Sequence, residues 1–579
     1  MSRFHSVLYS QRSFTGGVHV RKSSQILGGS RSVSFISASA NNIQPDISAD
    51  SEFFRFTPQN MLVQIDDILK SLPFGKLQKF VIFMHFLMFS TTSFIVYNYC
   101  FLLMMPTYLC TYQDPINPTK TFQEVCQREQ FCSADVLPRP LSWEVDQTSR
   151  FSLNNWITVL DMHCSSSFEI GLFGSLYFAG YLFSCAIFPP LSDKFGRKIF
   201  TIGVCFVQLI ALAAMLFIPN IMVYYLVNAI IGASQPLKAM IAYTHLMEWS
   251  HGYESITSGI LFCYDGALFV LCPLMLLFIS NNTQMFVWIA LILNLVAIVI
   301  FFLFYFPESP VFLLDQGRYE EFNSVIQKLY DSNKVNDETQ VKLNNLIARF
   351  KSQKTERLES RKQQNQEQSK GIMQLIKSDP SILYNLILMI MNWCAASFTF
   401  YLLSFFIKYM PGDIFVNSIV SGLCCFSLLM EGPIQKKLST KVGQSISFAL
   451  GLIAAVGICF FDKHTNQVVL YSLVLLIAKS GAELAFAFVT LIHLELFPTS
   501  FLVTSYGICN IFCRMVTMFA PIVAEIPNPM VPLTFLIGLN LVGVVGSIIL
   551  KTRKLQQQNE QQNTDELLNK QQNKSQQQE

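Results

Sequence analysis

Long runs of apolar residues dominate the chain and recur at regular intervals. Each run is about as long as the ~20 residues that an α-helix needs to cross a bilayer. They are too long for the ~10-residue alternating strands of a membrane β-barrel. The pattern predicts twelve transmembrane helices, of which the ninth is the shortest, over residues 80–106, 168–188, 199–218, 221–247, 257–280, 285–306, 381–407, 414–435, 446–461, 467–492, 504–524 and 530–550.

Polar segments between these runs outline the domains. Residues 1–45 contain no acidic and five basic residues, which favours a disordered cytoplasmic tail over an organelle transit peptide. Fourteen of the last 24 residues are Gln or Asn, a composition that cannot build a packed core. The predicted parts are a cytoplasmic region 1–75, a six-helix half 76–306 with an extracytoplasmic loop 107–166, a cytoplasmic segment 307–379 with short helices, a second six-helix half 380–552, and a tail 553–579.

Composition excludes two broad classes. Of the 579 residues, 51% are hydrophobic and only 14% are charged, against roughly 25% charged in soluble domains. So few charges cannot cover a soluble surface, so neither a water-soluble enzyme nor a disordered protein fits. The net charge of +3 is too small to favour nucleic-acid binding.

Basic residues indicate the orientation, because cytoplasmic loops carry an excess of Lys and Arg. The loops after the second, eighth and twelfth spans would be cytoplasmic, as would both termini. A plasma-membrane location is the leading expectation. The residues that carry this signal are Lys194, Arg197, Lys198, Lys436, Lys437, Lys441, Lys551, Arg553 and Lys554.

Four of the fifteen cysteines fall in the 107–166 loop. On the oxidising side of a membrane they predict two disulfides, with three connectivities open. The other cysteines mostly lie within spans, where we expect small apolar residues without disulfides. The paired residues would be Cys110, Cys126, Cys132 and Cys164.

A short motif occurs twice, six spans apart. Leu191–Arg197 reads LSDKFGR and follows the second span, and Leu438–Gln444 reads LSTKVGQ and follows the eighth. Matching Leu, Ser, Lys and Gly at the same topological point predicts two six-helix halves related by a parallel repeat. A binding site would then lie between them near mid-membrane.

The first copy resembles the signature loop of the major facilitator superfamily, with Pro189 in place of its leading Gly. Residues 307–314, PESPVFLL, are similar to an element that sugar porters share with organic ion transporters. The resemblance extends from about residue 76 to 552. It implies an all-α membrane protein with twelve helices in two pseudo-repeats, functional as a monomer.

Two features favour the organic cation/anion/carnitine branch (solute carrier 22-like) over sugar porters. The long cysteine-bearing loop after the first span is typical of that branch, and Asn392-Trp393-Cys394 stands where sugar porters show Gln-Gln. The spacing from Lys479 through Glu495 and Arg514 to Pro521 also follows that branch. A sugar or polyol porter remains the alternative.

Ionisable groups within spans are costly and mark candidate substrate sites. Arg514 lies at a position that, in the resembling family, is Arg in anion and carnitine transporters. A guanidinium there can bind a carboxylate bidentately. Lys479 is a second cation, although Glu483 one turn later is positioned to neutralise it. Glu431 resembles a carboxylate that faces the cavity in relatives.

Three further residues complete the predicted site. Lys238 in the fourth span either pairs with Asp265 or lines the cavity. Trp393 and Tyr401 can hold an ammonium group by cation–π contact, although packing within the bundle is the commoner role for an aromatic residue. An anionic end at Glu431 and a cationic end at Arg514 suit a zwitterion.

The resemblance also implies a cytoplasmic gate in which acids pair with arginines. Ser255, Val311, Gln444 and Leu502 stand where the family pattern has arginine. With several pairs missing, the substrate-free protein is expected to rest open to the cytoplasm, unless charges in 307–379 replace them. The predicted gating residues are Asp193, Gly196, Arg197, Lys198, Glu248, Glu308 and Glu495.

The sequence therefore predicts a carrier of small organic ions in a lipid bilayer, working by alternating access. A transporter-like receptor without net flux is a second class. Histidine and cysteine spacings show no metal site, nucleophile elbow or Walker lysine, so we expect neither an enzyme nor a cofactor. No pattern identifies the coupling ion.

Overall fold

The computed structural model describes residues 68–352 and 380–551, apart from residues 70, 115–118, 134–135, 462–466 and 498. Most of the predicted N-terminal region, the end of the 307–379 segment and the Gln/Asn-rich tail lie outside these ranges.

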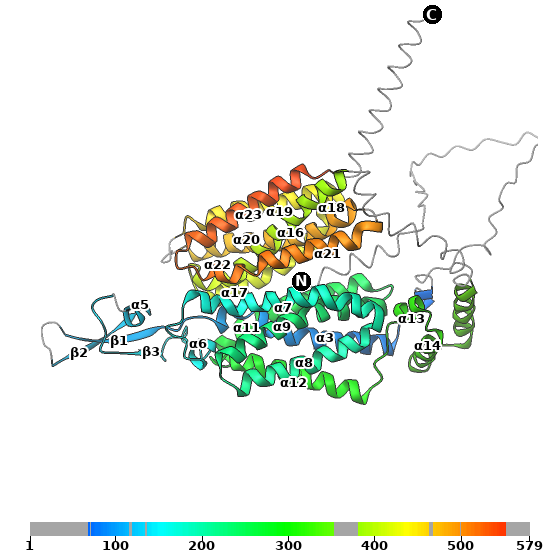
Figure 1. The fold of residues 1–579 in the computed structure, drawn as a ribbon, viewed down its shortest axis with the longest axis horizontal. Coiled ribbons are helices and arrows are strands. Elements are labelled where there is room, and N and C mark those ends of the chain that lie inside the picture. The colour runs from blue at the N-terminus through cyan, green and yellow to red at the C-terminus, as the bar shows by residue number, and fades with distance from the viewer. Residues whose placement is uncertain are drawn as a thin grey trace, which may run out of the picture.

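The first half of the chain forms the lower bundle in Figure 1 (the N half, residues 76–306). Its fourth span is continuous but changes register at a π-helix, directly after Pro236, whose nitrogen cannot donate to the helix ladder. The helices are α3 (Lys76–Val96), α4 (Tyr99–Leu102), α7 (Ser167–Phe195), α8 (Arg197–Phe217), α9 (Ile221–Pro236), η2 (Leu237–Ala242), α10 (Tyr243–Trp249), α11 (Glu254–Phe278) and α12 (Gln284–Leu303).

The second half forms the upper bundle in Figure 1 (the C half, residues 380–551). Two short amphipathic helices, α13 (Pro310–Gln316) and α14 (Tyr319–Asn333), precede it. The helices of the C half are α16 (Pro380–Phe406), η3 (Ile407–Tyr409), α17 (Ile414–Gly422), η4 (Leu423–Met430), α18 (Glu431–Leu438), α19 (Thr440–Ile458), α20 (Val468–Leu496), α21 (Thr499–Thr517), α22 (Ala520–Ala524) and α23 (Met530–Ile549).

Eleven helices in the described part of the chain are long and apolar enough to cross a membrane. The remaining predicted span is the one divided among α9, η2 and α10, none of which is long enough alone. Every predicted span therefore coincides with helix. Large differences at a single end are found in the second span, where α7 ends at Phe195 rather than at 188, and in the ninth, where α19 begins at Thr440 rather than at 446.

The predicted extracytoplasmic loop folds at one end of the bundles, which we call the disulfide end (Figure 1). It contains a three-stranded antiparallel sheet in the order β2-β1-β3, which no pattern in the sequence indicates. Residues 107–166, the disulfide domain, comprise β1 (Tyr108–Gln113), β2 (Thr121–Cys126), α5 (Glu129–Cys132), β3 (Ser142–Val145) and α6 (Trp156–Val159).

The internal repeat is present, but its predicted register is wrong by four residues. Gly196 precedes α8 with φ 104° and ψ 163°, and Ser439 precedes α19 with φ 99° and ψ 154°. These two turns are equivalent, so Ser439 rather than Gly443 corresponds to Gly196. Thr440, not Gln444, then corresponds to Arg197. The turn with positive φ, and not the matching letters of the two motifs, therefore defines the structural register.

Ser439 occupies backbone space that is essentially reserved for glycine, at a cost of order 1–3 kcal/mol. Replacing Ser439 with glycine removes this strain but also removes a weak cap, in which the Val442 amide donates to Ser439 Oγ at 3.5 Å. The net effect should be a stabilisation of about 1 kcal/mol. Thermal unfolding in detergent would measure the change. Ser445→Gly, inside α19, should act in the opposite direction. A lower midpoint for Ser439→Gly would contradict the assignment of strain.

Candidate functional site

Arg514 lies at the boundary between the two halves. It is carried by α21, it is fully buried, and its Nη1 donates to Ser397 Oγ of α16 at 3.3 Å. Its guanidinium carbon lies 4.4 Å from the ring centroid of Tyr181, which belongs to α7 of the N half. A planar cation thus contacts helices of both halves.

Two tyrosines lie against this guanidinium. The hydroxyls of Tyr181 and Tyr401 both interact with Arg514. The ring of Tyr401 also meets Phe178 of α7 edge-on, with centroids 4.7 Å apart. Tyr401 was predicted, whereas Tyr181 was missed. Its signal was the i,i+4 spacing from Tyr177, which puts two tyrosines on one face of α7.

Lys479 does not form the predicted local ion pair with Glu483. Its Nζ donates to the Phe400 carbonyl at 3.0 Å and to Ser404 Oγ, both on α16. The ammonium also lies 4.0 Å from the Phe400 ring centroid and 5.9 Å from that of Phe269 in α11. Because α16 satisfies the lysine, the carboxylate of Glu483 is left half-buried beside it.

Asp265 is not the partner of Lys238. Its carboxylate accepts hydrogen bonds from Ser93 Oγ at 2.6 Å and from the hydroxyl of Tyr97, both on the first span or directly after it. The charge of Glu483, from the other half, acts on both Asp265 and Tyr97. Two carboxylates therefore approach each other across the boundary between the halves.

Lys238 lies inside the N half and is not brought to Arg514. Its Nζ donates to the Met88 carbonyl at 2.9 Å and to Thr92 Oγ1 at 3.1 Å, and it also contacts Thr91 and Gln208. Only 1% of the residue is exposed. These neutral acceptors replace the carboxylate that we expected, because α3 and α8 bring their polar side chains to the π-helix.

Trp393 and Glu431 both lie in the C half. Trp393 is fully buried and meets the rings of Phe486 and Tyr506 edge-on, at 5.8 and 5.4 Å, so it packs within that half. Glu431 is half-buried at the first residue of α18, an eight-residue helix that packs on η4, α19 and α20.

Glu308, which follows the N half, and the predicted gating residues of that half form one compact cluster. The Glu308 carboxylate accepts hydrogen bonds from the amides of Arg197, Lys198 and Ser309 at 2.8–3.1 Å. Burial raises the pKa of Glu308, while these amides lower it. Gly196 permits the contact, because a Cβ there would lie 2.3 Å from Glu308 Oε2.

Two ion pairs of this cluster join residues of the N half. Arg197 bonds Asp193 at 3.0 Å and lies 3.6 Å from Glu248. In the C half, Glu495 accepts from Thr440 Oγ1 at 2.5 Å. Thr440 thus replaces Arg197 in the second repeat, so the ion pair of the N half becomes a single hydrogen bond in the C half.

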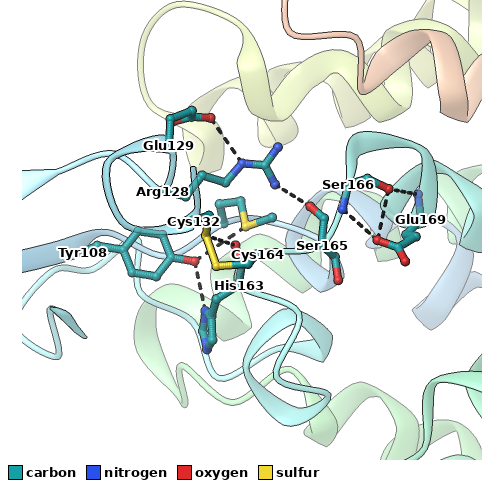
Figure 2. The surroundings of a disulfide bond; sticks show 10 residues. Tyr108, Arg128, Glu129, Cys132, His163, Cys164, Ser165, Ser166 and Glu169 are labelled. Carbon is teal, nitrogen blue, oxygen red and sulfur yellow. Dashed lines mark hydrogen bonds and ion pairs between the residues drawn. A yellow bond between two sulfur atoms is a disulfide. The ribbon is translucent and has the colours of Figure 1, made fainter. Parts of the chain in front are cut away.

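The four loop cysteines form two disulfides, Cys110–Cys126 and Cys132–Cys164. Figure 2 shows the second bond, beside which Arg128 donates to the Ser165 carbonyl at 3.1 Å and the Tyr108 hydroxyl lies 3.0 Å from His163 Nδ1. Burial lowers the pKa of His163 and raises that of Tyr108 to about 12. Among the described residues, the eleven other cysteines are free thiols.

Several known proteins are similar in sequence. Human organic cation/carnitine transporter 2 is 26% identical over 388 residues, which cover 66% of this chain and 65% of that protein. An organic cation transporter-like protein of Drosophila melanogaster is 23% identical over 463 residues, covering 77% and 79%. Mouse solute carrier family 22 member 4 is 24% identical over 392 residues, covering 66% of each chain. The matches thus span just under two thirds of the human and mouse relatives.

One solved structure has the same fold. The inward-open xylose transporter XylE of E. coli aligns with a TM-score of 0.51 at 12% identity, covering 81% of this chain and 94% of that one. The sequence profile of the Major Facilitator Superfamily matches residues 87–521, which include most of both halves. With two six-helix halves, a buried arginine between them and relatives in the solute carrier 22 group, this multi-pass membrane protein belongs to the Major Facilitator Superfamily.

Proposed function

We propose that the protein transports small organic ions that carry a carboxylate, zwitterions included, by alternating access between its two halves. The observation that carries the proposal is the fully buried guanidinium of Arg514, which contacts Ser397 in one half and Tyr181 in the other. A carboxylate bound there would form a charge-assisted, bidentate contact, and its binding would depend on how the halves are arranged.

For a zwitterion, we propose that the ammonium end binds near Asp265 and Glu483 rather than at Glu431. These two carboxylates belong to different halves and act on each other electrostatically. The ring of Phe269, next to Tyr97 at 5.0 Å between centroids, adds an aromatic face. Together with Arg514 and Lys479, the four charges sum to zero, which suits a substrate without net charge.

Asp265→Asn is expected to raise the KM for zwitterions by about 10- to 100-fold, since a hydrogen bond to a charged group contributes about 1.5–3 kcal/mol. Carboxylates without an ammonium group should be affected little. Tracer uptake in proteoliposomes measures both, and Asp146→Asn, in the disulfide domain, is the matched control. An equal loss for both substrate types would argue against an ammonium site at Asp265.

Flux in reconstituted vesicles tests the function itself. Labelled carnitine, a dicarboxylate, a permanent organic cation and a hexose would be compared. We expect uptake of carnitine or the dicarboxylate. Hexose uptake alone would favour the sugar porter, and saturable binding without flux would favour a receptor.

We further propose a plasma-membrane location with cytoplasmic termini, which epitope tags at each terminus would test in intact and permeabilised cells.

A further inference from the structure

The two halves pack closely against each other at the disulfide end. Cys100 Sγ of α4 lies 3.9 Å from Ser418 Oγ of α17. The rings of Phe101 and Phe415, from the same two helices, stack with centroids 5.3 Å apart. A continuous core of buried residues runs from one half into the other here. This end is closed, and in alternating access these surfaces must separate.

A buried ion pair supports the closed arrangement. Lys408 Nζ and Glu525 Oε1 lie 2.7 Å apart, and each side chain is only 2% exposed. The same ammonium donates to the carbonyl of Leu103 in the N half at 2.8 Å. Leu103 caps the C-terminus of α4, where a carbonyl lacks a helical partner and a cation is favoured. Lys408 therefore contacts both halves while its charge is neutralised within its own.

The disulfide domain adds a second connection. Arg150 forms an ion pair with Asp413 Oδ2 of the C half. The other oxygen, Asp413 Oδ1, accepts from the amide of Phe415 at 2.7 Å and so caps α17. Asn155 of the same domain donates to the carbonyls of Phe101 and Met104 at 2.8 and 2.7 Å. The domain is thus fixed to the end of the first span and reaches across to the start of α17.

We propose that the disulfide domain is a clamp: through Arg150 and Asp413 it stabilises the state closed at this end, and it releases whenever this end opens. This inference rests on the proposed alternating access. When the halves separate, the contacts of Arg150 with Asp413 and of Lys408 with Leu103 break. The Lys408–Glu525 pair lies wholly within the C half and can persist, so no buried charge is left alone. Contacts present in only one state shift the balance between the two.

The native thiol of Cys100 reports on the clamp, because it is buried against Ser418 while this end is closed. Full-length protein in liposomes would be treated with a charged maleimide, and alkylation of Cys100 would be followed by peptide mass spectrometry. Arg150→Ala and Asp413→Asn should each raise the rate by about 1.5- to 5-fold, the range for an exposed ion pair. Asparagine retains the cap of α17.

Two controls separate the clamp from general loosening. Lys120→Ala removes a charge from an exposed site of the same domain and should leave the rate unchanged. Cys205, buried inside the N half, should stay unlabelled in every variant. The double variant Arg150→Ala/Asp413→Asn should react no faster than the faster single variant.

Unchanged or slower alkylation of Cys100 in both single variants would overturn the clamp, as would a double variant whose effect is the product of the two. Because alkylation is measured without substrate, a protein that fails to transport any tested solute but shows the expected rates would refute the proposed function and leave the clamp intact.

Discussion

Arg514→Ala is expected to lower kcat/KM for carboxylate-bearing solutes by at least about 30-fold. Truncating one partner of a desolvated, hydrogen-bonded charge pair costs about 2–5 kcal/mol, and ~1.4 kcal/mol is a factor of ten. Arg514→Lys retains the charge without the planar fork and should recover only part of the activity. Arg514→Asp should abolish uptake of anions and zwitterions, and the same vesicles would be assayed for new uptake of simple cations.

Because Arg514 is fully buried, loss of uptake must be separated from loss of folding. Thermal unfolding and elution behaviour in detergent would accompany each flux measurement. Ser397→Ala removes a hydroxyl that contacts Arg514 but no charge, so it should reduce uptake much less. If the wild-type protein moves only permanent monocations and the Arg514→Ala variant is equally active, the proposal that Arg514 binds a substrate carboxylate is wrong.

Gly196→Ala should destabilise the protein by about 3 kcal/mol or more. The φ of 104° alone costs a non-glycine residue of order 1–3 kcal/mol. The new Cβ would also displace the Glu308 carboxylate from the amides of Arg197, Lys198 and Ser309, and each hydrogen bond to a charged group is worth about 1.5–3 kcal/mol. The thermal midpoint in detergent measures the loss.

Gly203→Ala is the matched control for this effect. Gly203 lies in α8, the helix that Gly196 precedes, and a Cβ there would meet no atom within 4 Å, so alanine should be neutral or stabilising. If Gly196→Ala and Gly203→Ala unfold at the same temperature, the turn is not strained and Glu308 is not held as described.

The sequence alone determined where the chain crosses the membrane and how it divides into halves. A helix in hydrocarbon must satisfy its own backbone hydrogen bonds and present apolar side chains over a fixed length, and both requirements are local. The spans and the two halves follow from that, and the cysteine-bearing domain was indicated by four cysteines in the long loop after the first span. The small sheet of this domain was missed because its strands are short and β2 is largely exposed, so no apolar pattern marks them.

Only the tertiary structure decided which side chains meet. The partner of a charged residue depends on the helix face opposite it, which spacing along one helix does not reveal. Lys479 therefore bonds α16 instead of Glu483, and Asp265 bonds Ser93 and Tyr97 instead of Lys238. The repeat register depended on backbone conformation at Ser439, because a left-handed turn leaves no reliable signature when a serine occupies it. Likewise, Tyr181 reaches Arg514 only because the two halves pack together.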